Sequence, residues 1–126
     1  MITHINPASI PPAPFLSPGV LITKPERMLF ISGQVGVSAD GTMAEGIADQ
    51  TRVAIGNLQA VLAEAGMGTE DVIKYTIYLT DPANLEGFFE AGGGAVPQPG
   101  PAATLLIVGQ LADPRLLVEI EAVAAA

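Results

Sequence analysis

The spacing of the apolar residues changes abruptly in the middle of this chain, and that change constrains the fold more than any other feature. Between Ile47 and Ala65 apolar residues recur at steps of three and four, the period of an amphipathic helix, and Gly66 supplies its end. From Val72 to Thr80 apolar and polar residues alternate, the period of a strand with one covered face. The covered face of this strand is predicted to carry Ile73, Tyr75, Ile77 and Leu79. The helix is therefore expected to cover one face of a sheet that contains this strand.

Shorter elements surround this pair. The first 18 residues are proline-rich and predict turns rather than regular structure. Gly19–Ile22 and Met28–Ser32 are apolar and flank a polar turn with the sequence TKPER, which predicts a hairpin, and the second strand is predicted to continue to the Asp40-Gly41 turn.

Asp81-Pro82 has the chemistry of a helix N-terminus and predicts a short helix that the run of three glycines from Gly92 ends. Two further strands are expected at Thr104–Val108 and Leu116–Ala124, joined as a hairpin by GQLADPR. The order of elements predicts an α+β domain with helices on one face of a mixed sheet.

Composition excludes several classes of function. The net charge is −8, and the five cations are scattered without a basic stripe, which disfavours nucleic-acid binding. No apolar run reaches the roughly 18 residues that cross a bilayer, and the start lacks the pattern of a secretory signal, so a cytoplasmic location without membrane contact is the default expectation. One histidine and no cysteine make a zinc site very improbable. With 49% hydrophobic residues in a short chain, part of the surface is expected to be covered by copies of itself.

Four segments of the chain resemble the RidA family, the YjgF-type reactive-intermediate deaminases: SGQVGV, QTRVAIGNLQAVLAEAG, VIKYTIYLTD and LVEIEAVA. Each motif is weak alone, but all four occur in the family's order and spacing from about Pro14 to the C-terminus. The resemblance implies a chorismate-mutase-like α+β fold over a single domain, residues 1–126, with two helices on one face of a mixed sheet of the six-stranded type. It also implies a homotrimer with inward-facing sheets and three clefts between subunits. In active members those clefts hydrolyse enamines and imines formed from amino acids, with no metal or organic cofactor.

One position departs sharply from the family. The signature before the penultimate strand is Pro-Ala-Arg-Ser/Thr, and this chain has Pro101-Ala102-Ala103-Thr104. The family's arginine binds the substrate carboxylate, and only arginine offers a planar fork of donors for it. Losing such a charged contact costs on the order of 1.5–3 kcal/mol. The resemblance therefore predicts that deamination of amino-acid-derived imines is lost.

Other positions that the resemblance assigns to the cleft are partly changed and partly kept. Leu16 falls where the family has a tyrosine, with Phe15 adjacent, and Phe88 or Phe89 lies near an expected asparagine. Glu119 matches the glutamate that orients the hydrolytic water in the family. The full set of expected cleft residues is Leu16, Ser17, Ser32, Gly33, Phe88, Phe89, Ala103 and Thr104, with Glu119 as the candidate catalytic group.

Each candidate also has a plainer interpretation. Glu119 is either a general base with a raised pKa in a dry cleft or a solvated or inter-subunit carboxylate. Ser32 and Gly33 either present backbone amides to a ligand or only let strand and turn pass closely. Arg115 is expected at the surface, at the far end of the last hairpin. His4 has no acidic or hydroxyl partner at meaningful spacing and is expected to be structural or without a role.

Two functions remain open after these observations. The chain is either an enzyme that hydrolyses or binds a small apolar or uncharged C–N compound, with Glu119 and a bound water, or a non-catalytic module whose cleft binds a small ligand or a protein. Within the enzymatic function, retained deamination of enamines and imines is the less favoured hypothesis. A ribonuclease activity is disfavoured by the charge of −8 and the absence of a basic surface.

Overall fold

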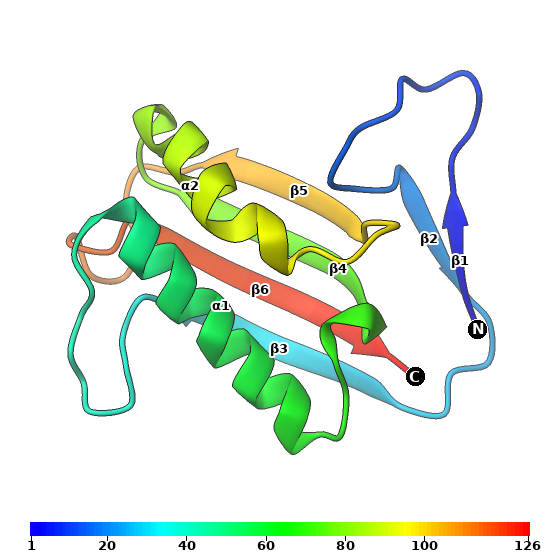
Figure 1. The fold of residues 1–126 in the computed structure, drawn as a ribbon, viewed down its shortest axis with the longest axis horizontal. Helices are drawn as coiled ribbons and strands as arrows, with labels where there is room; N and C mark the ends of the chain where they lie inside the picture. The colour runs from blue at the N-terminus through cyan, green and yellow to red at the C-terminus, as the bar shows by residue number, and fades with distance from the viewer.

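A computed structural model describes residues 1–126 and shows a four-stranded mixed sheet with two helices on one face (Figure 1). The strands lie in the order β3 (Met28–Val35), β6 (Val118–Ala125), β4 (Val72–Leu79) and β5 (Ala102–Ile107). β6 runs antiparallel to both of its neighbours, and β5 runs parallel to β4. The prediction of an α+β architecture with helices on one face is confirmed.

Alternate side chains of β6 pack against the two helices that cover the sheet. Helix α1 spans Gly46–Glu64 and helix α2 spans Leu85–Gly92, and both match the predicted segments within a few residues. The buried residues of the central strand β6 are Val118, Ile120, Ala122 and Ala124, which face the helices. From α1 they meet Leu58 and Leu62, each almost fully buried. Burying one such side chain stabilises the fold by about 1.5–3 kcal/mol, so this layer supplies most of the core.

Short turns complete the chain. Three 3₁₀ turns lie at Thr69–Asp71, Pro82–Asn84 and Gly93–Ala95. Asp81 accepts a hydrogen bond from the Ala83 amide at 2.9 Å, as its predicted capping chemistry requires. Gly66 has φ +71°, which confirms it as the residue that ends α1. On β4 a register shift between Val72 and Lys74 places Val72, and not Ile73, in the core, so the predicted face is wrong at that one residue.

The predicted N-terminal hairpin is wrong. β2 (Gly19–Ile22) pairs with β1 (Ile2–Ile5) in a separate two-stranded ribbon, and β3 pairs with β6. The chain turns away after β2 at Lys24, whose φ is +49°, and the amides of Glu26 and Arg27 then donate to the carbonyl of Ala126. The sheet is thus divided four plus two instead of six-stranded, and the proline-rich start does contain regular structure.

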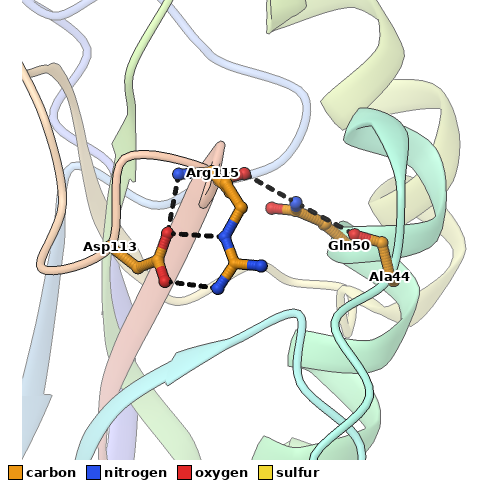
Figure 2. Close-up of polar contacts among 4 residues, drawn as sticks. All are labelled: Ala44, Gln50, Asp113 and Arg115. Atoms are coloured by element: carbon orange, nitrogen blue, oxygen red, sulfur yellow. Dashed lines mark hydrogen bonds and ion pairs between the residues drawn. The ribbon is translucent and has the colours of Figure 1, made fainter.

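The predicted C-terminal hairpin is also wrong, because β4 lies between β5 and β6 and the two do not pair. The loop between them is held by Gln50 of α1, which is 2% exposed. Its side-chain amide donates to the carbonyls of Ala44 and Arg115, both at 3.1 Å, and its carbonyl accepts from the Leu117 amide at 2.8 Å. Figure 2 shows the two donated bonds and, beside them, the exposed Arg115–Asp113 ion pair. Hydrogen bonds from Arg115 lower the pKa of Asp113 to about 2.

We expect Gln50→Leu to destabilise the protein, because it leaves a buried amide and two carbonyls without partners. Each such group costs about 1–3 kcal/mol when it stays unpaired, and partial hydration of the loop limits the total to roughly 2–4 kcal/mol. Urea unfolding followed by circular dichroism measures the loss. Gln59→Leu is the matched control, since Gln59 is exposed on the same helix; equal losses in the two variants would contradict the assigned role of Gln50.

Candidate functional site

A cavity of about 130 Å³ lies between the helices and the β4–β5 half of the sheet. We call it the apolar pocket; Phe15, Leu16, Tyr75, Phe88, Phe89 and Ala103 are among its lining residues. Thirteen of the seventeen lining residues are hydrophobic, and none is charged. A cavity of this size is comparable to an engineered apolar cavity that binds benzene, so it has room for about one small ring.

The floor of the pocket follows from strand pairing. In the parallel β4–β5 ladder Tyr75 is paired with Ala103, and Ile77 with Leu105. Side chains alternate between the faces of a sheet, so these four residues lie on the same side, toward the helices. Ala103 contributes only a methyl group to this floor.

Aromatic rings form the mouth. Phe15 stacks on Phe89 with ring centroids 6.1 Å apart and planes inclined by 16°. Phe88 meets Phe89 edge to face at 5.4 Å. Phe88 is buried, whereas Phe15 and Phe89 are partly exposed. The stacked pair therefore lies where the pocket meets solvent.

Tyr75 brings a polar group into this apolar surrounding. Burial raises the pKa of Tyr75 to about 12. At neutral pH the phenol is uncharged and can donate a hydrogen bond. The other polar side chains of the pocket, Gln59 and Thr69, are neutral as well. The arrangement suits an uncharged ligand with one acceptor atom and offers nothing to balance a negative charge.

Glu119 lies on the opposite face of the sheet. Its neighbours Val118 and Ile120 are buried under the helices, so Glu119 and Glu121 point to the open face. There they form an acidic groove with Gly33, Tyr78 and Gln110. The Tyr78 hydroxyl donates to Glu121, and this bond, with burial and the nearby carboxylates, raises the pKa of Tyr78.

Ser32 and Gly33 sit in an irregularity of β3. The β3–β6 register shifts between Ile31 and Gln34, so the two residues form a bulge. A Cβ added at Gly33 would lie 2.6 Å from Cδ of Glu119. The glycine therefore makes room for the Glu119 side chain, which supports the close-approach interpretation of this position.

The residues expected to share one cleft are thus divided within a single protomer. Leu16, Phe88, Phe89 and Ala103 line the apolar pocket, and Gly33 and Glu119 line the acidic groove. Ser32 is exposed. Thr104 is on the open face, where its Oγ1 accepts a hydrogen bond from Lys74 Nζ at 2.8 Å. Ser17 lines neither site and is 3% exposed.

Sequence reasoning missed two features of the site. Tyr75 is a pocket residue, and the alternation along β4 had already placed it on the helix-facing side. The prediction that His4 has no hydroxyl partner is wrong, because His4 Nδ1 lies 3.0 Å from Ser17 Oγ. No local pattern could reveal this contact, since it joins a strand to a loop 13 residues away.

No three His, Cys, Asp or Glu side chains gather in a way that could hold a metal ion. Neither helix has the length and apolar character to cross a bilayer.

The fold and the pocket define a small α+β protein with a ligand-sized cavity between its helices and the edge of its sheet. Residues 10–126 match the family described as endoribonuclease L-PSP. The chain belongs to this family, the RidA/YjgF family. The mitochondrial protein mmf2 of Schizosaccharomyces pombe is 38% identical over 101 residues, which is 78% of this chain and 79% of mmf2. The RutC family protein PH0854 of Pyrococcus horikoshii is 36% identical over 103 residues, 80% of this chain and 81% of that protein.

Solved structures agree with this assignment. The Rid-family protein YyfB from Yersinia pestis superposes with a TM-score of 0.85 at 33% identity, over 99% of this chain and 98% of YyfB. TdcF of E. coli, solved with bound serine, superposes with a TM-score of 0.73 at 26% identity, over 96% and 93% of the two chains.

The raised pKa of Tyr75 predicts a specific loss of stability in alkali. An unfolded tyrosine ionises near its ordinary pKa of 10.0, and the folded one near 12. The contribution of the neutral Tyr75 phenol to the free energy of unfolding is therefore fully present below pH 10. It is lost as the pH rises toward 12, by about 1.4 kcal/mol per pH unit. Chemical unfolding at several pH values should show this slope in Tyr78→Phe and not in the double variant Tyr75→Phe/Tyr78→Phe, since Tyr78, whose pKa is also raised, is absent from both.

A direct titration checks the same pKa. The chain has two tyrosines and no tryptophan, so Tyr78→Phe leaves Tyr75 as the only phenol. Near-ultraviolet absorbance of that variant should report tyrosinate with a midpoint near 12. A midpoint near 10 would mean that the Tyr75 ring is open to water.

Proposed function

We propose that this protein binds a small, uncharged, largely apolar compound in the apolar pocket and has lost the deamination of amino-acid-derived imines. The observation that carries the proposal is the absence of any charged residue from the pocket, with Ala103 at its floor. A carboxylate moved from water into such a cavity loses its hydration without gaining a partner, which is strongly unfavourable.

None of the five cationic residues of the chain brings a positive charge into the apolar pocket. Arg115 is paired with Asp113 and Arg52 with Asp49, both at exposed positions. Arg27 donates to the Ala65 carbonyl, and Lys24 lies in the turn after β2. Lys74 on β4 is paired with Ala102 on β5, but its side chain donates to Thr104 on the opposite face of the sheet from the pocket. No cation of the same protomer lines the apolar pocket.

The comparison with TdcF sharpens the proposal. Its structure holds serine, an amino acid with a carboxylate. If this chain used its pocket in the same way, it would need a cation that the pocket does not have. A compound that offers an acceptor atom to the Tyr75 hydroxyl and apolar surface to the phenylalanines fits the lining better.

We propose further that the chain is a homotrimer whose clefts combine the two sites. The open face of the sheet exposes apolar side chains, among them Phe30 at 74%, Leu106 and Met28. Such a face on a small protein favours association. An assembly would also let Glu119 of one protomer approach the apolar pocket of another, which the fold forbids within one chain. Light scattering should give about three times the 12.9 kDa chain mass, and Phe30→Glu should lower it.

The proposed function has a catalytic version and a binding-only version, and a variant of Glu119 distinguishes them. In the catalytic version Glu119 and a bound water hydrolyse a C–N bond of the neutral compound. In the other the pocket only binds. Glu119→Gln should abolish turnover of the true substrate in the first version and leave ligand affinity unchanged in both. Turnover of 2-aminoacrylate generated in situ, within tenfold of an arginine-bearing relative, would contradict the loss of deamination.

A matched pair of probes tests the proposal. 4-Fluorobenzamide and 4-fluorobenzoate have nearly the same shape and differ in charge, and fluorine NMR reports their binding. We expect the amide to bind at least about tenfold more tightly, a difference of 1.4 kcal/mol or more. Equal affinities, or tighter binding of the benzoate, would contradict the proposal.

Ala103→Arg is the companion variant in this experiment. It adds the planar donor fork at the pocket floor and should shift the preference toward the benzoate. Thr104→Arg is the control, because it adds the same charge at the next residue on the opposite face. If both variants shift the preference equally, the effect is long-range and does not locate the ligand in the apolar pocket.

A further inference from the structure

The only histidine of the chain joins three segments that are distant in sequence. His4 lies on β1, and its Nδ1 is 3.0 Å from the Gly100 carbonyl oxygen and 3.0 Å from Ser17 Oγ. The Ser17 hydroxyl itself donates to the Gly100 oxygen at 2.6 Å. The three groups therefore meet around a single carbonyl.

The chemistry of that carbonyl assigns the proton on the imidazole. A carbonyl oxygen only accepts hydrogen bonds, so a bare Nδ1 lone pair 3.0 Å away would be repelled. Nδ1 must therefore carry hydrogen and donate to Gly100, which accepts from both side chains. The arrangement is not a Ser–His nucleophile, because the serine is buried and its hydrogen is directed to a carbonyl instead of the imidazole.

The same contact holds a wall of the apolar pocket. The Ser17 amide donates to the Pro101 carbonyl at 3.0 Å, and Gln98 Nε2 donates to the Pro14 carbonyl at 3.2 Å. A Cβ at Gly100 would come within 2.7 Å of the Phe15 carbonyl carbon, so the two segments pack backbone to backbone. The loop 14–17 and the loop 98–101 thus form one unit that carries Phe15 and Leu16 into the pocket.

We propose that His4 is a positioning residue whose hydrogen bond to Gly100 latches this wall and couples the docking of β1 to occupation of the pocket. The proposal rests on the proposed function, because the ligand that it invokes is the uncharged compound proposed to bind the apolar pocket. β1 pairs only with β2, and a two-stranded ribbon is marginally stable alone, so its contacts with the body of the protein decide whether it stays docked. A ligand that binds only when the wall is in place stabilises the docked ribbon. By thermodynamic linkage, undocking of the ribbon lowers the affinity for the ligand by the same factor.

Three variants test the latch. His4→Ala removes the donor. His4→Asn keeps a donor nitrogen the same number of bonds from the backbone as Nδ1 and should rescue. Thr3→Ala is the control, because Thr3 is exposed on the same strand and its side chain makes no contact of this kind. Thermal unfolding first shows that each variant is folded.

The ligand-free protein gives the first readouts. Nitrogen NMR of the single imidazole should show the neutral form protonated at Nδ1. Amide hydrogen exchange at Ser17, whose amide donates to Pro101, should accelerate at least about tenfold in His4→Ala and stay near the wild type in His4→Asn and Thr3→Ala. An imidazole protonated at Nε2 only, or unchanged exchange in His4→Ala, overturns the proposal.

Affinity for 4-fluorobenzamide gives the second readout. We expect His4→Ala to weaken binding by roughly three- to tenfold, the usual worth of one hydrogen bond, with rescue by His4→Asn. Faster exchange with unchanged affinity overturns the coupling while the proposed function stands. If the wild type binds no amide, the proposed function and the coupling to it both fail, and the exchange data then decide only whether the latch exists.

Discussion

The alternation along β6 is the constraint on which the rest of the structure depends. This strand pairs on both sides, with β3 and β4, and every second residue from Val118 to Ala124 is buried under the helices. A shift by one residue would expose the whole apolar set, so the register is firmly held. The same alternation directs Glu119 and Glu121 to the open face. Burial of the core thereby decides that the acidic groove and the apolar pocket lie on opposite faces of one sheet.

That separation shapes the chemistry available to one protomer. The apolar pocket has volume, aromatic walls and a neutral phenol but no charge, whereas the acidic groove has carboxylates and little enclosure. Neither half alone resembles a complete hydrolytic site. Binding is the function that a single chain can perform with the residues it brings together. In the proposed catalytic version a second copy would have to bring Glu119 to the pocket, so hydrolysis would depend on the proposed assembly.

Much of the architecture could be predicted because it rests on periodicity. The limits of α1 and β4 follow from spacing alone, and Asp81 and Gly66 act as the predicted start and stop signals. The two predicted hairpins failed for a shared reason: neighbours in sequence were assumed to pair. β3 and β5 instead pair with β6 and β4, which are not their predicted neighbours. The four-residue strand β1 carries too few residues for its alternation to be seen against the prolines around it.

The sequence by itself determined the family, the α+β class and the uncharged side chain of Ala103, because residue identity and spacing are properties of the linear chain. Only the tertiary structure decided that Ser17 is buried in contact with His4 and that Val72, instead of Ile73, faces the core. These outcomes depend on which side of a sheet a residue faces and on which distant loop meets it. Both are set by packing across the whole core, where contacts between distant residues, such as His4 with Gly100 at 96 positions apart, leave no local pattern.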